Sequence, residues 1–509
     1  MQKNPNFLIV MVDQLTGTLF ADGPADFLHV PTLRRFSDRA VRFANAYCAS
    51  PLCTPSRGAF MSGRLPSITG VYDNAAEFPA SMPTFAHYLR ALGYKTILSG
   101  KMHFVGPDQL HGFEERLTTD IYPADFGWTP DWRKPDERID WWYHNMSSVT
   151  NAGVAETTNQ LEFDDEVAYH AKLRLHQLAR FGNEQPFCLT VSFTHPHDPY
   201  VARRQYWDLY PEKNIPLPTF AEIPYEDQDP HSQRLYRAND YERFVITEQN
   251  ILDSRRAYFA NVSYLDAKIG EILDVLDACQ FADNTIIVFC ADHGDMLGER
   301  GLWFKMSFFE GAIRVPLLLH APDRFQARTV TEPVTLLDVL PTLVDLAGGD
   351  LDALQGETDG YSLRPLAEYN TGLNRPVLAE YAAEGSVDPM VMIREGRWKF
   401  NFCEVDPPQL FDLENDPQEQ TNLANDAKYV DTLNYFLEQV KRRWDIARFR
   451  EDVLCSQKHR HIVYDALRSG AYQPWDFQPL QKASERFMRN HLDLNILEAT
   501  ARFPRADGD

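Results

Sequence analysis

The sequence lacks the features of membrane proteins and of disulfide-stabilised proteins. No hydrophobic run is long enough to cross a bilayer. The seven cysteines are scattered and form no CxxC pair, which is typical of reduced thiols rather than of a disulfide framework. Residues 1–5 are polar and the apolar run at residues 7–12 ends at Asp13, so we expect no secretory signal. These absences predict a cytoplasmic protein without a membrane partner.

Positive charge is scarce as well. The formal net charge is -23 at pH 7, so nucleic acid phosphates would be repelled over most of the surface and nucleic acid is excluded as a partner. An anionic substrate would require positive side chains to be gathered locally. The candidates for this role are Arg57, Lys101, His103, His197 and Lys305.

No internal repeats or low-complexity segments are found, and apolar, β-branched runs alternate with amphipathic helical patterns. This alternation predicts an α/β fold with a mostly parallel sheet flanked by helices. The strand candidates are residues 7–12, 95–98, 187–193, 285–290 and 315–319. The clearest helix covers residues 253–279, where apolar side chains recur at spacings of three and four. Another helix is expected at residues 336–346, before Gly348 and Gly349.

The pattern changes near Arg375 to short alternating strands with Gly and Pro turns, followed by an expected helix at residues 430–444. Beyond residue 449 lies an extension rich in aromatic and arginine side chains. The sequence therefore predicts a large catalytic α/β domain at residues 1–374, a small antiparallel α+β subdomain at residues 375–448, and an extended arm at residues 449–509. So many aromatics rarely remain in water, so the arm is expected to pack either on its own body or on a neighbouring subunit. A homo-oligomer, either a dimer or a tetramer, is favoured over a monomer.

Polar side chains follow three of the expected strands. Asp13 follows the first, His195 and His197 follow the middle one, and Asp292 and His293 follow residues 285–290. Ligand sites in open α/β sheets lie at the carboxyl ends of the strands. We therefore expect these side chains to meet in one crevice.

The pentapeptide CTPSR, from Cys53 to Arg57, carries a thiol that a separate enzyme could oxidise to an aldehyde. A hydrated aldehyde has two hydroxyls on one carbon, so one can attack a sulfate ester and the other can expel sulfate by C–O cleavage. Pro55 fits the first turn of a helix, which would place Cys53 at an amino end that favours anions. So short a pattern also arises by chance in loops, and the other motifs decide between the two interpretations.

These other motifs resemble the type I sulfatases of the alkaline phosphatase superfamily, in which CxPxR marks conversion of the cysteine to formylglycine. The matching stretches are NFLIVMVDQ, SGKMH at 99–103, THPHDPY at 194–200, ADHGD at 291–295, Lys305 and LFDLENDPQEQTNLA. They come in the order that sulfatases show and extend from residue 6 to about residue 422. The resemblance implies an alkaline-phosphatase-like fold and a transient partner, the formylglycine-generating enzyme.

The resemblance also implies one divalent cation held by Asp13, the modified Cys53, Asp292 and His293. A mainly oxygen-donor set suits Ca²⁺ first, with Mg²⁺ as an alternative. Gln14 stands where a second aspartate is common, and His293 stands where asparagine is common. Imidazole suits transition metals better than Ca²⁺, so Mn²⁺ is a further alternative. Gln14 is either an amide-oxygen ligand or a support of the ligands.

By resemblance, Lys101 contacts the formylglycine and the sulfate, and His103 is the base that deprotonates the remaining hydroxyl. Arg57 would hold the hydrate and the carboxylates. His197 either donates a proton to the departing alkoxide or binds the sulfate oxygens together with Lys305. His195 is a weaker candidate than His197, and a structural role suits it.

Further stretches outside these motifs resemble the choline sulfatases, among them VDQLTGTLFADGPADFLH, RIDWWYHN and WDFQPLQKASERFMRNHLDLN. The resemblance implies hydrolysis of choline O-sulfate to choline and sulfate. A quaternary ammonium makes no hydrogen bonds and needs aromatic faces with a carboxylate nearby. We expect Trp128, His144 and Glu384 to form this pocket, with Asn74 orienting the ester. The sequence also offers Trp141, Trp142 and Tyr143 beside Asp140 and His144. The arm of a neighbouring subunit is expected to close the pocket.

Two alternatives stay open. A phosphonate monoester or phosphodiester hydrolase of the same superfamily would share the nucleophile and the metal residues. A non-catalytic binding protein for choline esters would result if Cys53 stayed a thiol.

Overall fold

The structure is a computed structural model that describes residues 4–135, 137–138, 144–181, 185–322, 324–369 and 371–480. Trp141, Trp142, Tyr143 and Asp140, which the sequence offers for the choline pocket, lie outside these ranges. So does the arm beyond residue 480.

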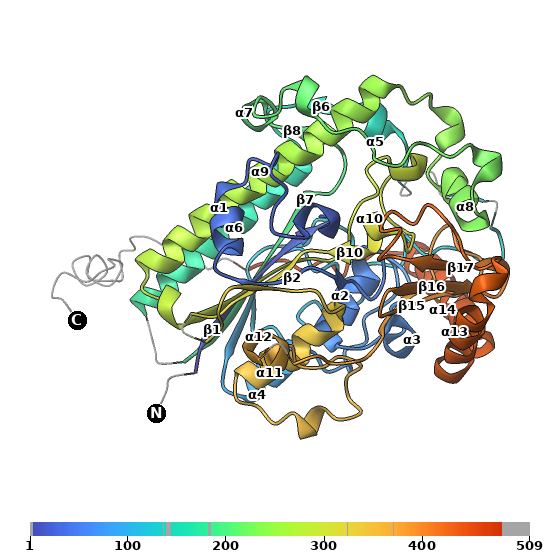
Figure 1. Cartoon of the computed structure of the whole chain (residues 1–509). Coiled ribbons are helices and arrows are strands. Elements are labelled where there is room, and N and C mark those ends of the chain that lie inside the picture. The colour runs from blue at the N-terminus through green and yellow to red at the C-terminus, as the bar shows by residue number, and fades with distance from the viewer. Residues whose placement is uncertain are drawn as a thin grey trace.

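An eight-stranded sheet carries the core, with strand order β12-β2-β11-β9-β1-β7-β4-β5 (Figure 1). Its strands are β1 (Asn6–Asp13), β2 (Val41–Phe43), β4 (Lys95–Gly100), β5 (Glu115–Arg116), β7 (Phe187–Pro196), β9 (Thr285–Ala291), β11 (Leu317–His320) and β12 (Arg328–Val330). Every residue of β1, β7 and β9 is buried. Their continuous apolar runs are those of strands covered on both faces.

The sheet is mostly parallel, as the sequence predicts. β1 pairs in parallel with β7 and β9, and β4 pairs in parallel with β7 and β5. β11 is the exception, because it runs antiparallel to β9 and β2. The strand expected at residues 315–319 is divided by Pro316 into β10 (Arg314–Val315) and β11. Proline has no backbone N–H to donate to a ladder, which explains the division.

Helices cover both faces of the sheet, as predicted (Figure 1). On one side lie α1 (Pro31–Ser37), α6 (Asn159–Arg180) and α9 (Glu248–Ala278); on the other lie α2 (Cys53–Ser62), α4 (Phe85–Ala91), α11 (Val339–Leu346) and α12 (Arg364–Tyr369). The predicted start of α9 at residue 253 is too late. Thr247 and Asn250 form a capping box that begins the helix at Glu248. α11 is preceded by a 3-10 turn at Leu336–Asp338.

The C-terminal part contains a separate antiparallel sheet, as predicted. Its strands are β14 (Val377–Tyr381), β15 (Met390–Glu395), β16 (Trp398–Cys403) and β17 (Asp406–Asp412), in that order. It is joined by α13 (Val430–Arg443) and α14 (Ile446–Arg468). Phe400, Phe436 and Phe449 belong to the apolar core that these elements share. The expected boundary at residue 449 falls inside α14, and the three-part division stays a prediction.

Shorter elements connect these layers. A three-stranded sheet is formed by β10, β3 (Ala46–Tyr47) and β13 (Val334–Thr335), and β6 (Gly153–Val154) pairs with β8 (Val201–Ala202). The short helices are α3 (Pro66–Thr69), α5 (Ser147–Thr150), α7 (Arg204–Trp207), α8 (Pro230–Ala238) and α10 (Glu310–Ile313).

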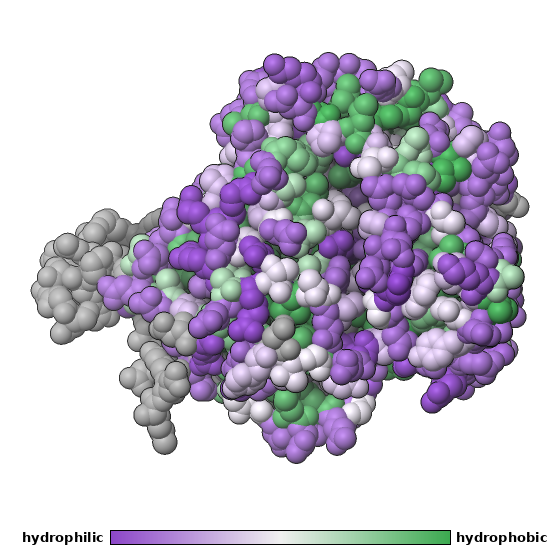
Figure 2. Space-filling view, viewed as in Figure 1, coloured by the Kyte–Doolittle hydropathy of each residue, from purple (hydrophilic) through white to green (hydrophobic). Residues whose placement is uncertain are grey.

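Hydrophilic side chains cover most of the face seen in Figure 2, and the apolar groups lie in separate patches. Among the described residues, no helix combines the length and the apolar character needed to cross a membrane.

Candidate active site

The predicted site residues converge at the carboxyl ends of neighbouring strands. Asp13 ends β1, Asp292 and His293 follow β9, and Lys101 follows β4. The strands β4, β7, β1 and β9 are consecutive neighbours in the sheet. Their ends therefore share one crevice, as expected for an open α/β sheet.

Cys53 is the first residue of α2, a helix in which all residues are buried. Leu52 at the N-cap makes no side-chain hydrogen bond to the helix. Asn74 supplies the missing acceptor, since its Oδ1 accepts a hydrogen bond of 3.0 Å from the backbone N–H of Thr54. Asn74 thus fixes the turn that presents Cys53.

Basic groups surround the thiol of Cys53. Its Sγ lies 3.2 Å from His293 Nε2. It lies 3.6 Å from Lys305 Nζ and 3.7 Å from Lys101 Nζ. An anion bound at this atom would therefore meet two ammonium groups in a protein whose overall charge is strongly negative.

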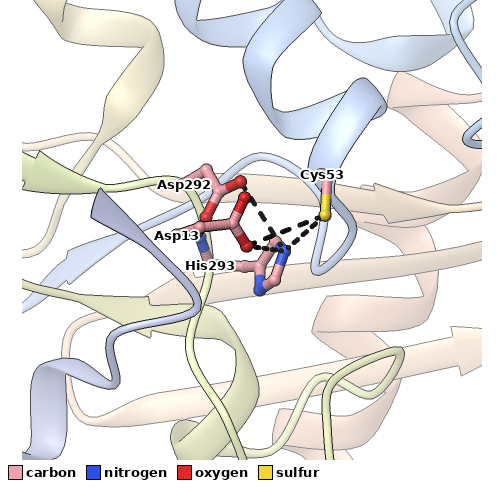
Figure 3. Close-up of side chains that lie close together, drawn as sticks. All are labelled: Asp13, Cys53, Asp292 and His293. Carbon is pink, nitrogen blue, oxygen red and sulfur yellow. Dashed lines mark hydrogen bonds and ion pairs between the residues drawn. The ribbon is translucent and has the colours of Figure 1, made fainter. Parts of the chain in front are cut away.

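Asp13, Cys53, Asp292 and His293 each offer one ligand atom, and these atoms lie within 4.8 Å of one another (Figure 3). His293 Nδ1 donates to Gly294 O at 3.0 Å, because a carbonyl can only accept. Burial lowers the pKa of His293. The neutral ring then keeps its Nε2 lone pair, which faces both carboxylates at 3.7 and 3.8 Å. This donor set fits one divalent cation.

Arg57 holds the two carboxylates in place. Its Nη2 and Nε donate to Asp13 Oδ2 and Asp292 Oδ2, each at 2.8 Å, and its Nη1 donates to Lys101 O and Ser192 Oγ. Burial alone would raise the pKa of Asp13, but Lys101, in ion-pair contact with it, and Arg57 hold that pKa well below its ordinary value. Asp13 therefore remains a carboxylate.

Lys305 and His197 form a pair beside the thiol. His197 Nδ1 donates to Asp198 O at 2.6 Å, so its Nε2 accepts from Lys305 Nζ at 2.7 Å. Burial and the neighbouring Lys305 place the pKa of His197 well below its usual value. Lys305 also donates to Gln14 Oε1 at 2.6 Å, and the amide nitrogen of Gln14 donates to Asp295 at 2.6 Å. This orientation favours the supporting role over the ligand role for Gln14.

His195 lies in the same motif but points elsewhere. Its Nδ1 lies 2.7 Å from Asp164 Oδ2, and its ring contacts Tyr264 edge to face. These contacts match the structural role expected for it.

An aromatic group borders the thiol on the side of β4. The ring of His103 packs against Tyr122 and Trp128, with centroids 5.1 and 5.7 Å away. Burial lowers the pKa of His103, while the Cys53 side chain acts in the opposite direction. Lys101 Nζ lies 4.3 Å from the centre of the Tyr122 ring. Both ring nitrogens of His103 are buried without a hydrogen-bond partner among the described residues, and the lowered pKa favours the neutral ring.

One cavity of about 260 Å³ joins the thiol to the predicted choline pocket. Its lining includes Cys53 and all four predicted substrate residues, Asn74, Trp128, His144 and Glu384. His144 stacks on Phe304 and lies 3.2 Å from Asp198 through its Nδ1. Glu384 Oε2 is buried without a hydrogen-bond partner among the described residues. Burial raises the pKa of Glu384 to about 7.

Sequence reasoning missed several members of this site. Tyr122, Gln160 and Asp198 line the cavity, and Asp295 anchors Gln14. Asp198 and Asp295 stand inside quoted motifs, THPHDPY and ADHGD, so the motifs themselves were a signal. Tyr122 and Gln160 stand in no general sulfatase motif, and only the folded chain brings them into the cavity that Cys53 also lines.

Comparison with known proteins agrees with these features. Family models match residues 5–349 ("Sulfatase"), 298–445 ("N-sulphoglucosamine sulphohydrolase, C-terminal") and 451–503 ("Choline sulfatase enzyme C terminal"). The chain is 60% identical to a choline-sulfatase of Rhizobium meliloti over 99% of both chains. It is 25% identical to an arylsulfatase of Clostridium perfringens, over 85% of this chain and 92% of the relative.

Among solved structures, the phosphonate monoester hydrolase SpPMH of Silicibacter pomeroyi shares the fold. Its TM-score is 0.69 at 22% identity, over 86% of this chain and 94% of the other. The sulfatase model covers more than half of the chain and the 60% relative spans nearly all of it. The chain belongs to the sulfatase family, and it is a sulfuric ester hydrolase.

Proposed function

We propose that this chain hydrolyses choline O-sulfate to choline and sulfate. The observation that carries the proposal is the single cavity that Cys53, Trp128 and Glu384 line together. The relative at 60% identity is a choline-sulfatase, and the match to a choline sulfatase C-terminal model at residues 451–503 supports the same substrate. The direct test is release of sulfate and choline from choline O-sulfate by the purified protein.

The nucleophile in this proposal is residue 53 after conversion to formylglycine by a formylglycine-generating enzyme. The hydrated aldehyde supplies one hydroxyl for attack and one for collapse. Cys53 Sγ stands where the oxygens of this hydrate would lie, and the ammonium groups of Lys101 and Lys305 face it at 3.7 and 3.6 Å. These two charges would hold the sulfate oxygens and stabilise the charge that grows on them.

The protonation and the hydrogen bonds of His103 and Lys305 indicate which of them accepts and which donates a proton in the proposed reaction. His103 is buried and neutral, so it can accept the proton of the remaining hydroxyl. Lys305 carries the proton beside the leaving oxygen, because His197 Nε2 only accepts from it. His197 would then orient the Lys305 ammonium rather than act as the acid itself, and water would return the proton to Lys305 after the alcohol leaves.

The cation in this proposal is bound by Asp13, Asp292, His293 and an oxygen of residue 53. When bound, it supplies Lewis-acid stabilisation of sulfate and lowers the pKa of the hydrate. Ca²⁺ is the first choice for the oxygen donors and Mg²⁺ is an alternative. The imidazole of His293 makes Mn²⁺ a further alternative. Gln14 supports the site through Lys305 and Asp295.

The choline end of the substrate would lie against Trp128, with the Glu384 carboxylate countering its charge. Trp128→Ala should raise KM for choline O-sulfate by roughly tenfold, since one cation–π contact is lost. The same variant should change KM for 4-nitrophenyl sulfate by less than about twofold. Trp128→Phe keeps an aromatic face and should show a smaller rise. Equal losses on both esters would argue against this pocket.

Glu384 gives the pocket a pH dependence. Burial raises its pKa to about 7, so the carboxyl is neutral below this value and charged above it. Only the charged form attracts a quaternary ammonium, so KM for choline O-sulfate should fall as pH rises through 7. At one pH unit below 7, KM for choline O-sulfate should be up to about tenfold higher than its value well above pH 7. In Glu384→Gln the ratio of KM for choline O-sulfate to KM for the aryl ester should not vary with pH. A wild-type ratio that is also flat would contradict this role.

The cysteines bear on the cellular compartment of the enzyme, and the aromatic arm bears on its oligomeric state. All seven cysteines are free, and six of them are buried, which supports a reducing, cytoplasmic compartment. A homo-oligomer stays a proposal that rests on the aromatic arm.

Two alternatives have their own tests. The fold likeness to a phosphonate monoester hydrolase makes kcat/KM for a phosphonate ester against choline O-sulfate the deciding comparison. A binding protein without catalysis would retain an intact thiol at Cys53 and bind choline esters without releasing sulfate.

A further inference from the structure

Helix α14 holds a buried ion pair with a loop far away in the sequence. Arg460 Nη1 and Nη2 donate to Asp73 Oδ1 and Oδ2 at 2.7 and 2.6 Å. The Asp73 side chain is fully buried and that of Arg460 is 6% exposed. Arg460 also donates to Thr129 Oγ1 at 3.1 Å, and its Nε donates to Ser456 Oγ at 3.2 Å. Such a two-pronged contact fixes orientation as well as distance.

Two of the partners of Arg460, Asp73 and Thr129, adjoin residues of the cavity. Asp73 precedes Asn74, and its Oδ1 also accepts from the backbone N–H of Ala75 at 2.9 Å, which sets the turn at Asn74. Thr129 follows Trp128. One guanidinium group therefore fixes the two segments that present Asn74 and Trp128 to the substrate.

The same face of α14 reaches the third segment of the pocket. Gln457 Oε1, one turn before Arg460, accepts from the backbone N–H of Trp132 at 3.0 Å. Trp132 Nε1 in turn donates to Ala383 O at 3.1 Å, next to Glu384. This chain of contacts extends the support of α14 to the carboxylate of the pocket.

Helix α14 packs closely against residues 127–130, so this segment can shift little relative to the helix. A Cβ atom added at Gly127 would lie 2.8 Å from Tyr464 Oη. His461 Nε2 lies 3.3 Å from Pro130 O. Residues 127–130 are therefore held along the length of one helix face.

The sulfate end of the site is supported by other elements. Asp13, Lys101 and Asp292 stand at strand ends of the central sheet. In the described part of the chain, no hydrogen bond or ion pair of α14 reaches any of these three residues. Asn74 also accepts from the backbone N–H of Thr54, but Arg57 and Ser56 anchor α2 independently of Asn74. Damage to the contacts of α14 should therefore fall mainly on the leaving-group half of the cavity.

We propose that Arg460 is a specificity-determining positioning residue, which fixes Asn74 and Trp128 around the leaving group by holding Asp73 and Thr129. The inference rests on the proposed function for its substrate, a sulfate ester whose alcohol carries a quaternary ammonium. Arg460 acts through these residues and does not touch the substrate itself.

The test compares choline O-sulfate with 4-nitrophenyl sulfate in the full-length enzyme. Arg460→Gln should lower kcat/KM for choline O-sulfate by roughly tenfold or more, mainly through KM, since a misplaced Trp128 forfeits its cation–π contact. The aryl ester should change by less than about twofold, and inhibition by inorganic sulfate should be unchanged. Arg460→Lys keeps the positive charge but cannot make the two parallel hydrogen bonds to Asp73. Its kcat/KM for choline O-sulfate should lie between those of the wild type and Arg460→Gln. Arg448→Gln, an exposed position on the same helix, is the matched control.

Removing Arg460 alone leaves the buried Asp73 carboxylate without its counter-charge, so folding needs its own control. The double variant Asp73→Asn with Arg460→Gln removes both charges and should melt close to the wild type. It should still show the raised KM for choline O-sulfate. A double variant with wild-type melting temperature and wild-type KM would overturn the inference.

Other outcomes distinguish a failure of the inference about Arg460 from a failure of the proposed function. Wild-type enzyme active on choline O-sulfate, with Arg460 variants that lose both esters equally, would overturn the inference and leave the proposed function standing. Wild-type enzyme that cleaves the aryl ester but not choline O-sulfate would overturn the proposed function and this inference with it.

Discussion

Cys53→Ala is expected to reduce turnover of choline O-sulfate by about 10⁴-fold or more, the scale of losing a nucleophile in a hydrolase. Alanine offers neither a thiol to oxidise nor an aldehyde to hydrate. The charges around the position remain, because Arg57 still holds both carboxylates through its own hydrogen bonds. Folding should therefore survive, and the loss should fall on kcat. Initial rates of sulfate release measure the effect.

Cys455→Ala is the matched control for this variant, since Cys455 is the exposed cysteine of the chain. It should retain wild-type turnover. Substantial activity in Cys53→Ala would mean that another group attacks the ester, and the assignment of residue 53 would be wrong.

Removal of divalent cations is expected to give the second largest effect. Dialysis against a chelator should lower activity by at least about 100-fold, because the Lewis acid contributes several kcal/mol to the transition state. Returning Ca²⁺, Mg²⁺ or Mn²⁺ separately should restore it to different extents and identify the preferred ion. Cation addition should also raise the melting temperature, since the ion binds only the folded cluster.

Asp292→Asn tests which residues hold the cation. This change removes one ligand charge and weakens the contact of Arg57, so metal affinity and turnover should fall together. Asp274→Asn, at an exposed position on α9, should leave both unchanged. Wild-type metal affinity in Asp292→Asn would place the cation elsewhere.

Much of the fold could be predicted because its strands carry local signals. Continuous apolar runs mark β1, β7 and β9, and the polar residues after them fall at one sheet edge. The reversed direction of β11 could not be predicted, since an apolar run reads the same in both directions. The start of α9 was missed because Thr247 and Asn250 act as a cap through side-chain geometry rather than through hydrophobic spacing.

The candidate site also contains residues that could be predicted from the sequence and contacts that could not. Residues in short motifs, such as Cys53 and His293, could be found because their chemistry is tied to local sequence. The direction of the Gln14 amide depends on Lys305 and Asp295, nearly 300 positions away along the chain. The pairing of Arg460 with Asp73 joins residues 387 positions apart. Such contacts are set by tertiary packing, and no local pattern indicates them.

The most direct test is the mass of the peptide that contains Cys53, measured on the enzyme preparation that hydrolyses choline O-sulfate. A formylglycine at residue 53 predicts a peptide in which one oxygen has replaced the sulfur and two hydrogens, in a fraction that follows the specific activity. Full activity in protein whose peptide retains the intact thiol would contradict it.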